Sequence, residues 1–372
     1  MDAHARIQLA ANGATLEITF PNGPPLCVHP LWLRERVRGA MHLDPLTEQR
    51  LYNPSDLSPA EHITNIAQPA PGQFVVTFTD GVQGRFTTAE ILSELPTGAD
   101  PTLPPERPWN TQTPAPEPHD WRGCETPGAE RAVLQDYLAH GYVILTNVPT
   151  TEGAVLQVAR RFGYVRETNF GTLFDVRSVP AASDLAYTAL KLDPHTDNPY
   201  RHPVPGIQLL HCLANRTPGG LSTLVDGLAV AETLRRESPE AFASLTNTPI
   251  RFRYTDATTE LIATAPLIEL RPRGQVAAIH YSPRLDATPL LPAPELEIFF
   301  AARRLLDRLL RSDRFERRFR LDEGHLMMFN NRRLLHGRTG FDPNAGLRHL
   351  QGCYIDADGP ASRYRVLHRS QL

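Results

Sequence analysis

Proline limits the possible folds of this chain more than any other residue type. There are 35 prolines in 372 residues, and eight of them lie in the stretch 95–118 (LPTGADPTLPPERPWNTQTPAPEP). Proline fixes φ and lacks an amide hydrogen, so it disfavours helix interiors and central strands and favours extended backbone. We therefore predict a small domain over residues 1–99, a proline-rich linker over 100–117 and a larger domain over 118–372.

The segment before the linker is rich in short strand-like runs separated by turn residues. The runs are 15–20 (TLEITF), 26–33 (LCVHPLWL) and 73–80 (QFVVTFTD). One helix is expected over 87–95 (TTAEILSEL), with a threonine available as its cap. These patterns predict a small β-rich domain.

After the linker, helical patterns come first and strand-like runs follow. We expect helices over 129–141, 151–163 and 293–311, and strands in runs such as YVILTNV, GIQLLHCL, HLMMFN, LLHGRTGF and HLQGCYID. Early helices followed by many strands, with one long helix inserted, are typical of a barrel-like double sheet decorated by helices. The predicted fold class is therefore mainly β with helices.

Composition excludes several classes of protein. The net charge is −3 and the basic residues are scattered, which disfavours a nucleic-acid or anionic-membrane partner. The four cysteines form no CxxC pair, so a disulfide framework or a thiolate zinc site is not expected. The start of the chain has no signal-peptide pattern, and no apolar run is long enough to span a membrane. We expect a cytoplasmic protein.

The segment LDPHTDNPY contains His195 and Asp197, which would point to the same side of an extended strand. A third ligand could come from His336, in the later strand-like run LLHGRTGF. Two imidazoles and one carboxylate on one face of an octahedral ion leave open positions, as non-heme Fe(II) oxygenases require. Chance His-x-Asp pairs are expected in a chain with 14 histidines, so this assignment depends on its context.

Arg348 follows His336 by twelve residues and precedes a strand-like run. A guanidinium matches a carboxylate with two parallel hydrogen bonds. We predict that Arg348 holds the distal carboxylate of 2-oxoglutarate, whose keto acid end would bind the iron. A surface arginine in an ordinary salt bridge is the alternative if Arg348 is considered alone.

The chain resembles the gamma-butyrobetaine dioxygenase and trimethyllysine dioxygenase family, within the taurine-dioxygenase-like superfamily. The resemblance rests on the stretches LAYTALKLDPHTDNPYRHPVPGIQLLHCL, GGLSTLVDG, FNNRRLLHGRTGF and RHLQGCYID, and LWLRERVRGAMHLDPLTEQRLYNPSD is similar to that family's amino-terminal domain. It implies a double-stranded β-helix (jelly-roll) core, Fe(II) held by His195, Asp197 and His336, and 2-oxoglutarate as cosubstrate. It also implies that Arg348 and Ser222 contact the cosubstrate carboxylate.

Members of this family that act on betaines surround the trimethylammonium group with aromatic rings. The corresponding positions in this chain are Phe170, Phe174, Tyr187 and Tyr354. Ring faces attract a weakly hydrated quaternary ammonium through cation–π interactions. Each of these rings could alternatively be an ordinary core residue.

Three departures from the family pattern concern zinc and the anionic end of the substrate. The stretch ERVRGAMHLDP contains no cysteine where many relatives hold zinc, so zinc is not expected there. Asp184 stands where relatives often have an asparagine that contacts the substrate carboxylate, and an ionised aspartate would repel that group. YSPRLD replaces an asparagine-rich segment, so Arg284 and Asn198 become the candidates for binding the anion.

The resemblance implies a dioxygenase that hydroxylates gamma-butyrobetaine or a close betaine analogue with O₂. Two alternatives are a hydroxylase of a 2-(trimethylamino)ethylphosphonate-like substrate and, from a different class, a betaine-sensing protein without turnover. The complete set of iron and cosubstrate residues disfavours the sensor. A homodimer is expected by family analogy alone.

Overall fold

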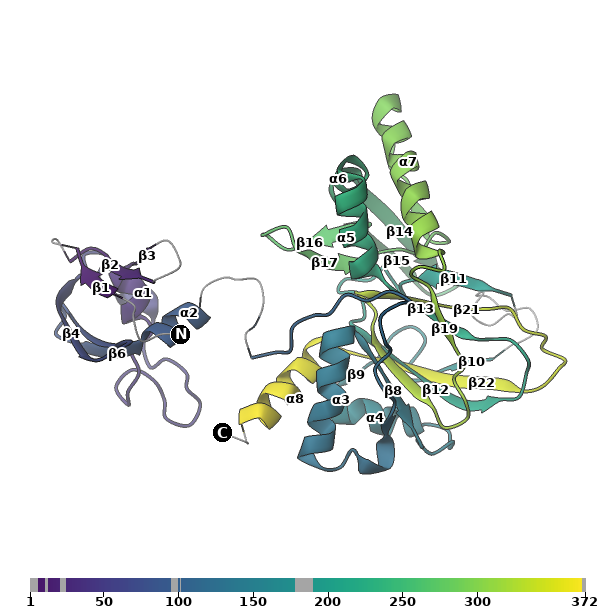
Figure 1. The fold of residues 1–372 in the computed structure, drawn as a ribbon, viewed down its shortest axis with the longest axis horizontal. Helices are drawn as coiled ribbons and strands as arrows, with labels where there is room; N and C mark the ends of the chain where they lie inside the picture. Colours follow the sequence, from purple (N-terminus) through teal and green to yellow (C-terminus); the bar gives the residue numbers. More distant parts are fainter. Residues whose placement is uncertain are drawn as a thin grey trace. The chain divides into compact units, whose positions relative to one another are not determined.

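A computed structural model describes residues 6–10, 13–20, 25–94, 100, 102–177 and 190–369. The chain forms two compact units, Met1–Thr97 and Gly98–Leu372 (Figure 1). The boundary between the units falls inside the proline-rich stretch. Later residues of that stretch are packed in the larger unit, since Trp109 is 2% exposed and its ring centroid lies 5.5 Å from that of Tyr142.

The smaller unit contains two three-stranded antiparallel sheets, with strand orders β1-β2-β3 and β4-β5-β6. Its elements are β1 (Arg6–Leu9), β2 (Leu16–Thr19), β3 (Leu26–Val28), α1 (Pro30–Arg34), η1 (Pro54–Asp56), β4 (Ile63–Ala70), β5 (Gln73–Phe78), β6 (Gln83–Thr87) and α2 (Thr88–Ser93). Alternate side chains of β5, namely Phe74, Val76 and Phe78, are buried, as the period of two of a strand requires.

The prediction of one continuous strand-like run over residues 26–33 is wrong. Strand β3 ends at Val28, and helix α1 begins at Pro30. Proline suits the first position of a helix because its φ is already helical and no hydrogen bond is lost there. The ring of His29 caps this helix by accepting a hydrogen bond from the amide of Leu31 at 3.2 Å.

Two sheets dominate the larger unit. The first has seven strands, in the order β10-β22-β12-β20-β8-β7 with β9 paired to β22, and the second has four, in the order β11-β21-β13-β19. Their bounds are β7 (His119–Asp120), β8 (Tyr142–Thr146), β9 (Val165–Arg166), β10 (Phe174–Val176), β11 (Leu192–His195), β12 (Ile207–Asn215), β13 (Ser222–Asp226), β19 (Arg317–Phe319), β20 (Leu326–Asn330), β21 (Leu334–Arg338) and β22 (Arg348–Ile355). The smaller strands are β14 (Pro249–Thr255), β15 (Glu260–Pro266), β16 (Ile268–Leu270), β17 (Val276–Ile279) and β18 (Asp286–Ala287).

The two main sheets share a buried core. Cys212, Phe329 and Leu350 of the seven-stranded sheet belong to one cluster with Leu224 and Leu334 of the four-stranded sheet. Two sheets closed around a common core form the predicted double-stranded β-helix, and the mainly β fold class is confirmed.

Helices cover the outside of this core. They are η2 (Trp121–Gly123), α3 (Pro127–His140), α4 (Ala154–Phe162), α5 (Gly227–Glu237), α6 (Pro239–Asn247), α7 (Ala293–Leu310) and α8 (Asp358–Arg369). Helices α3, α4 and α8 lie against the seven-stranded sheet (Figure 1), where Val133, Val158 and Leu367 pack with Leu209 and Ile355. Helices α5, α6 and α7 form a separate cluster with β14, β16 and β17.

The three helices predicted for this unit are confirmed. Helix α3 ends at His140 because Gly141 adopts a left-handed conformation, with φ of 80°, and closes the last turn. Helices α4 and α7 lie within the predicted ranges 151–163 and 293–311. In the described part of the chain, the helices are all too short or too polar to cross a lipid bilayer.

Candidate metal centre

Two neighbouring strands of the four-stranded sheet bring the predicted histidines together. Strands β11 and β21 are antiparallel, and His195 pairs directly with His336 in their register. Residues directly opposite each other on antiparallel strands have side chains on the same face. The two imidazole centroids therefore lie 4.3 Å apart, although the residues are distant in sequence.

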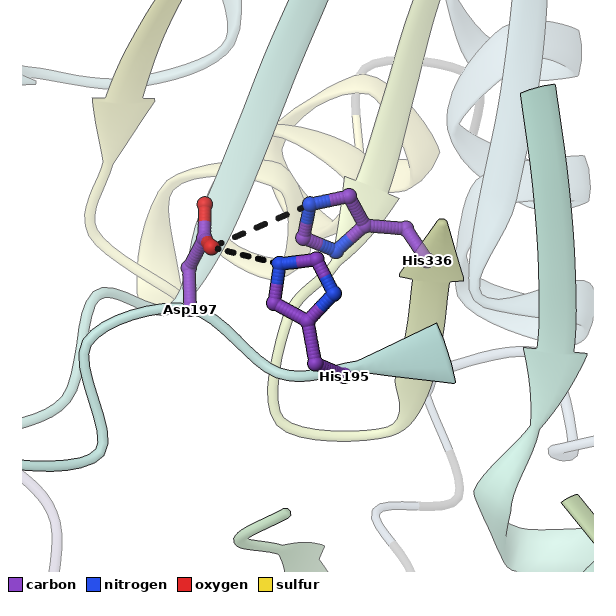
Figure 2. Close-up of side chains that lie close together, drawn as sticks. All are labelled: His195, Asp197 and His336. Carbon is purple, nitrogen blue, oxygen red and sulfur yellow. Dashed lines mark ion pairs between the residues drawn. The ribbon is translucent and has the colours of Figure 1, made fainter. Parts of the chain in front are cut away.

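Asp197 follows the end of β11 and completes the cluster (Figure 2). Its Oδ1 atom lies 3.4 Å from Nε2 of His195 and 3.8 Å from Nε2 of His336. One ligand atom from each residue lies within 4.8 Å of the other two, and no other cluster of three ligating residues occurs in the described ranges. Both rings are turned toward the same carboxylate, so three donors face one point.

The protonation states of these residues suit a divalent metal. Nδ1 of His195 lies 2.9 Å from the carbonyl oxygen of Asp193, an acceptor that favours the tautomer in which Nδ1 carries the hydrogen and Nε2 is available to a metal. Burial, together with His195, lowers the pKa of His336 to about 3, so this ring is neutral at pH 7. Burial raises the pKa of Asp197, whereas the protonated forms of His336 and His195 and a hydrogen bond from Tyr354 lower it, and the net effect holds this pKa below its usual range. Neutral imidazoles and an ionised carboxylate are the forms that bind metal.

The backbone that carries Asp197 is held by a residue that the sequence analysis did not single out. Asn331 is fully buried, and its Oδ1 accepts a hydrogen bond from the amide of Asp197 at 2.7 Å. Its Nδ2 donates to the carbonyl oxygens of Asp197 and Pro205, both at 3.0 Å. Asn331 therefore fixes the turn after β11 to the segment that leads into β21. The sequence feature that could have drawn attention to Asn331 is its position in the motif stretch FNNRRLLHG.

One cavity of about 110 Å³ contains the metal cluster and most of the other predicted site residues. The predicted residues that line it are Phe170, Phe174, His195, Asp197, Asn198, Ser222, Arg284, His336, Arg348 and Tyr354. Asp184 and Tyr187 lie outside the described residues. The polar lining residues that sequence reasoning missed are Thr196, Tyr200, Gln208, Ser282 and Arg338. Tyr200 and Arg338 lie within the quoted motifs HTDNPY and LLHGRTGF, so position in a motif was the signal for both.

A buried cation lies in this cavity. Arg348, at the start of β22, is 6% exposed, and its Nε makes no hydrogen bond to any residue in the described ranges. Burial and the charge of Arg338 lower the pKa of Arg348 to about 10, which still leaves it charged at pH 7. The ring of Phe341 lies 5.4 Å from the Arg348 guanidinium and 5.0 Å from that of Arg338. A buried guanidinium without a carboxylate partner fits an anionic ligand.

Aromatic rings form another part of the cavity wall. The rings of Phe174 and Tyr354 are tilted by 35° with centroids 5.2 Å apart. Strand β10 brings Phe174 over β22 at Gly352, where a Cβ atom would lie 2.4 Å from the Phe174 ring. Glycine at this position is therefore required for the placement of Phe174.

Further rings lie beside this pair. Phe170 contacts Tyr254 edge to face at 5.6 Å, and Tyr254 stacks on Tyr200 at 5.0 Å. The hydroxyl of Tyr200 donates to Oδ1 of Asn198 at 2.6 Å, so Asn198 is held by a neighbour within its own motif. Arg284 is exposed, in contrast to the buried Arg338 and Arg348, so the cavity is lined by one cation that reaches solvent and two that are buried.

Comparisons with known proteins agree with the fold and the cluster. The sequence pattern of the taurine catabolism dioxygenase TauD, TfdA family matches residues 117–354. A gamma-butyrobetaine dioxygenase from Pseudomonas sp. (strain AK-1) is 36% identical over 97% of this chain and 95% of that protein. The mitochondrial trimethyllysine dioxygenase of Bos taurus is 29% identical over 91% of this chain and 82% of that protein.

A solved structure has the same fold at low sequence identity. The asparagine oxygenase in complex with Fe(II), 3-hydroxyasparagine and succinate is 20% identical, with a TM-score of 0.50 over 62% of this chain and 80% of that one. Together, the double-stranded β-helix and the His-Asp-His cluster define a 2-oxoglutarate-dependent non-heme iron dioxygenase. The chain belongs to the TauD/TfdA dioxygenase family, and the predicted resemblance to gamma-butyrobetaine and trimethyllysine dioxygenases is confirmed.

Proposed function

We propose that this protein hydroxylates a small trimethylammonium substrate, gamma-butyrobetaine or a close analogue. The observation that carries the proposal is the cavity itself, in which a metal-binding cluster, a buried cation and a group of aromatic rings face one another. The near full-length similarity to a gamma-butyrobetaine dioxygenase supports the choice of substrate.

In this proposal His195, Asp197 and His336 would hold Fe(II). The metal, with 2-oxoglutarate and O₂, would supply the hydroxylation of a substrate C–H bond, and succinate and CO₂ would be the other products. The protein contributes placement. Arg348 binds the distal carboxylate of 2-oxoglutarate, and Ser222, which lines the same cavity on β13, adds a hydroxyl near that carboxylate. Placement matters because the target carbon must lie next to the metal for the reaction to be coupled.

The two ends of the substrate require different surroundings. Ring faces bind the trimethylammonium group, and they come from Phe170, Phe174 and Tyr354 of the cavity and from Tyr187 of the stretch LAYTALKLDPHTDNPY. Arg284, at the exposed side of the cavity, binds the anionic end, and Asn198 offers a further polar contact. An ionised Asp184 would repel an anion bound beside it.

A panel of substrates tests this function. Gamma-butyrobetaine, its phosphonate analogue, trimethyllysine and a neutral analogue with a tert-butyl group would each be incubated with Fe(II) and 2-oxoglutarate. We expect a product heavier by one oxygen atom from gamma-butyrobetaine and no product from the neutral analogue. If the phosphonate analogue is turned over faster, the proposed substrate carries a phosphonate in place of a carboxylate. If the betaine binds but no succinate is released, the protein is a sensor.

We expect Phe174→Ala to raise KM for gamma-butyrobetaine by roughly 2- to 30-fold, the range that a cation–π contact of about 0.5–2 kcal/mol supplies. The ring would no longer cover the cation, whereas the metal cluster would be untouched. Steady-state kinetics with the trimethylammonium substrate, together with binding of the tert-butyl analogue, measure the effect. Equal losses for both compounds would contradict a role for Phe174 in cation recognition.

We expect Arg348→Met to raise KM for 2-oxoglutarate by roughly 10- to 100-fold, because a charge-assisted pair of hydrogen bonds is lost. Succinate formation at varied 2-oxoglutarate concentration measures the change. Arg216→Met is the control, since Arg216 is 70% exposed at its side chain and pairs with Glu323 on the surface. An unchanged KM in the Arg348 variant would remove this residue from the cosubstrate site.

We further infer that the protein is cytoplasmic and forms a homodimer. We also infer that residues 1–99 act as an N-terminal domain and residues 118–372 as an oxygenase domain, connected by the linker 100–117, whose later residues pack in the larger unit. The family match over residues 117–354 supports the bounds of the oxygenase domain. Light scattering of the full chain would test the dimer.

A further inference from the structure

We propose that Tyr354 positions the metal ligand Asp197, in addition to lining the substrate cavity. Its hydroxyl holds one carboxylate oxygen, so that only the other oxygen faces the metal position. The inference rests on the proposed metal-binding role of the cluster, but not on the identity of the substrate.

The two oxygens of Asp197 have different surroundings. Oδ2 accepts a hydrogen bond from the Tyr354 hydroxyl at 2.7 Å. Oδ1 is the atom that lies 3.4 Å from Nε2 of His195 and 3.8 Å from Nε2 of His336. The carboxylate is therefore oriented with one oxygen toward the two imidazoles and the other toward the phenol.

The position of Tyr354 makes this hydrogen bond a rigid one. Tyr354 lies within β22 and is paired with Gln208 on one side and with Arg166 on the other. It is 5% exposed, and its ring packs against Phe174. The backbone of Asp197 is fixed independently by Asn331, so both partners of the hydrogen bond are held in place.

The chemical consequence concerns the number of open metal positions. An octahedral ion held by two histidines and one carboxylate oxygen would have three positions left for other ligands such as the keto acid and O₂. A carboxylate bound through both oxygens would take one of those three. A hydrogen bond to Oδ2 disfavours that second contact, because the oxygen already has a partner and its orientation is fixed. Such supporting hydrogen bonds typically change metal affinity by about 10- to 100-fold.

Tyr354→Phe tests the inference because it removes the hydroxyl and keeps the ring that lines the cavity. We expect Kd for Mn(II) and Co(II), measured by calorimetry without substrate, to rise by roughly 10- to 100-fold. We also expect the visible absorption spectrum of the Co(II) protein to change, because the carboxylate is no longer constrained. KM for gamma-butyrobetaine should change much less than in Phe174→Ala, since the aromatic face is retained.

Tyr281→Phe is the matched control. Tyr281 is 3% exposed, and its hydroxyl donates to Oδ1 of Asp307 at 2.7 Å, so it is also a buried tyrosine bonded to a carboxylate. It does not line the cavity that holds the metal cluster. Its metal Kd and Co(II) spectrum should match those of the unaltered protein.

The inference would be overturned if Tyr354→Phe left both the metal Kd and the Co(II) spectrum unchanged. If only KM for the betaine rose, Tyr354 would be assigned to substrate binding alone. If the variant is less stable, the Mn(II)-induced rise in its melting temperature, compared with that of the Tyr281 variant, separates affinity from folding. A smaller rise supports the inference, and an equal rise contradicts it. Absence of betaine hydroxylation in the unaltered protein would contradict the proposed function but would leave these metal measurements valid.

Discussion

Replacing His336 with alanine should reduce succinate formation by at least about a thousandfold, a larger effect than loss of a supporting hydrogen bond at a metal site produces. His195 and Asp197 would then offer two protein donors, and the face of the ion that His336 covers would open to water. Fe(II) affinity should fall together with activity, because the imidazole is a direct donor in the cluster.

Measurement of Kd for Mn(II) and of succinate release would separate binding from chemistry. His368→Ala provides a control, because His368 lies on α8, where its ring stacks on Tyr364 at 6.3 Å, and is not part of the metal cluster. Retention of metal binding and turnover in the His336 variant would show that the cluster is not the catalytic centre.

The second large effect is expected on stability. Arg333 and Asp226 form a buried ion pair in which Nε and Nη2 of the arginine donate to the two carboxylate oxygens at 3.1 and 2.8 Å. Asp226 is fully buried and Arg333 is 6% exposed. The same carboxylate accepts a hydrogen bond from the amide of Trp109, and the same guanidinium donates to the carbonyl oxygen of Ala139. The pair thus joins the proline-rich stretch, the end of α3, the end of β13 and the start of β21, the strand that carries His336.

Arg333→Met should therefore lower the free energy of unfolding of the larger unit by about 3–5 kcal/mol, because Asp226 would remain as a buried charge without its partner. Urea unfolding followed by tryptophan fluorescence measures the loss. Arg253→Gln is the control, since Arg253 and Glu260 form an exposed ion pair whose removal should cost less than about 1 kcal/mol.

A double variant, Asp226→Leu with Arg333→Met, should regain part of the stability lost in the single variant, because no unpaired charge would remain. A loss below about 1 kcal/mol in the Arg333 variant would indicate that water or another group compensates Asp226.

The sequence allowed the secondary structure near the site to be predicted because the relevant signals are local. The strand-like run LLHGRTGF contains β21, and the glycine after His140 ends α3 where expected. The run 26–33 was misjudged because its apolar residues suit a strand, whereas Pro30 starts a helix with His29 as its cap. In this run the apolar pattern favours a strand and the capping residues favour a helix, and the structure follows the capping residues.

Other features depend on pairs of residues that lie far apart in the chain. The sequence contained no signal that the Tyr354 hydroxyl would reach Asp197, and the motif that contains Asn331 did not indicate that its amide group would hold the backbone of that aspartate. Tyr354 was interpreted only as an aromatic ring, because its ring could be compared with family patterns and its hydroxyl could not. Both contacts arise from strand registers and turns that side-chain spacing along the chain does not specify.

By itself, the sequence determined the kinds of donor available and their local spacing: an imidazole and a carboxylate two residues apart, a second imidazole in a later strand, and an arginine twelve residues beyond it. Only the tertiary structure decided that His195 lies opposite His336, that one oxygen of Asp197 faces both rings, and that Arg348 is buried without a carboxylate partner among the described residues. The physical reason is that residue type and short-range geometry are encoded locally, whereas burial and convergence depend on which strands pair and in which register.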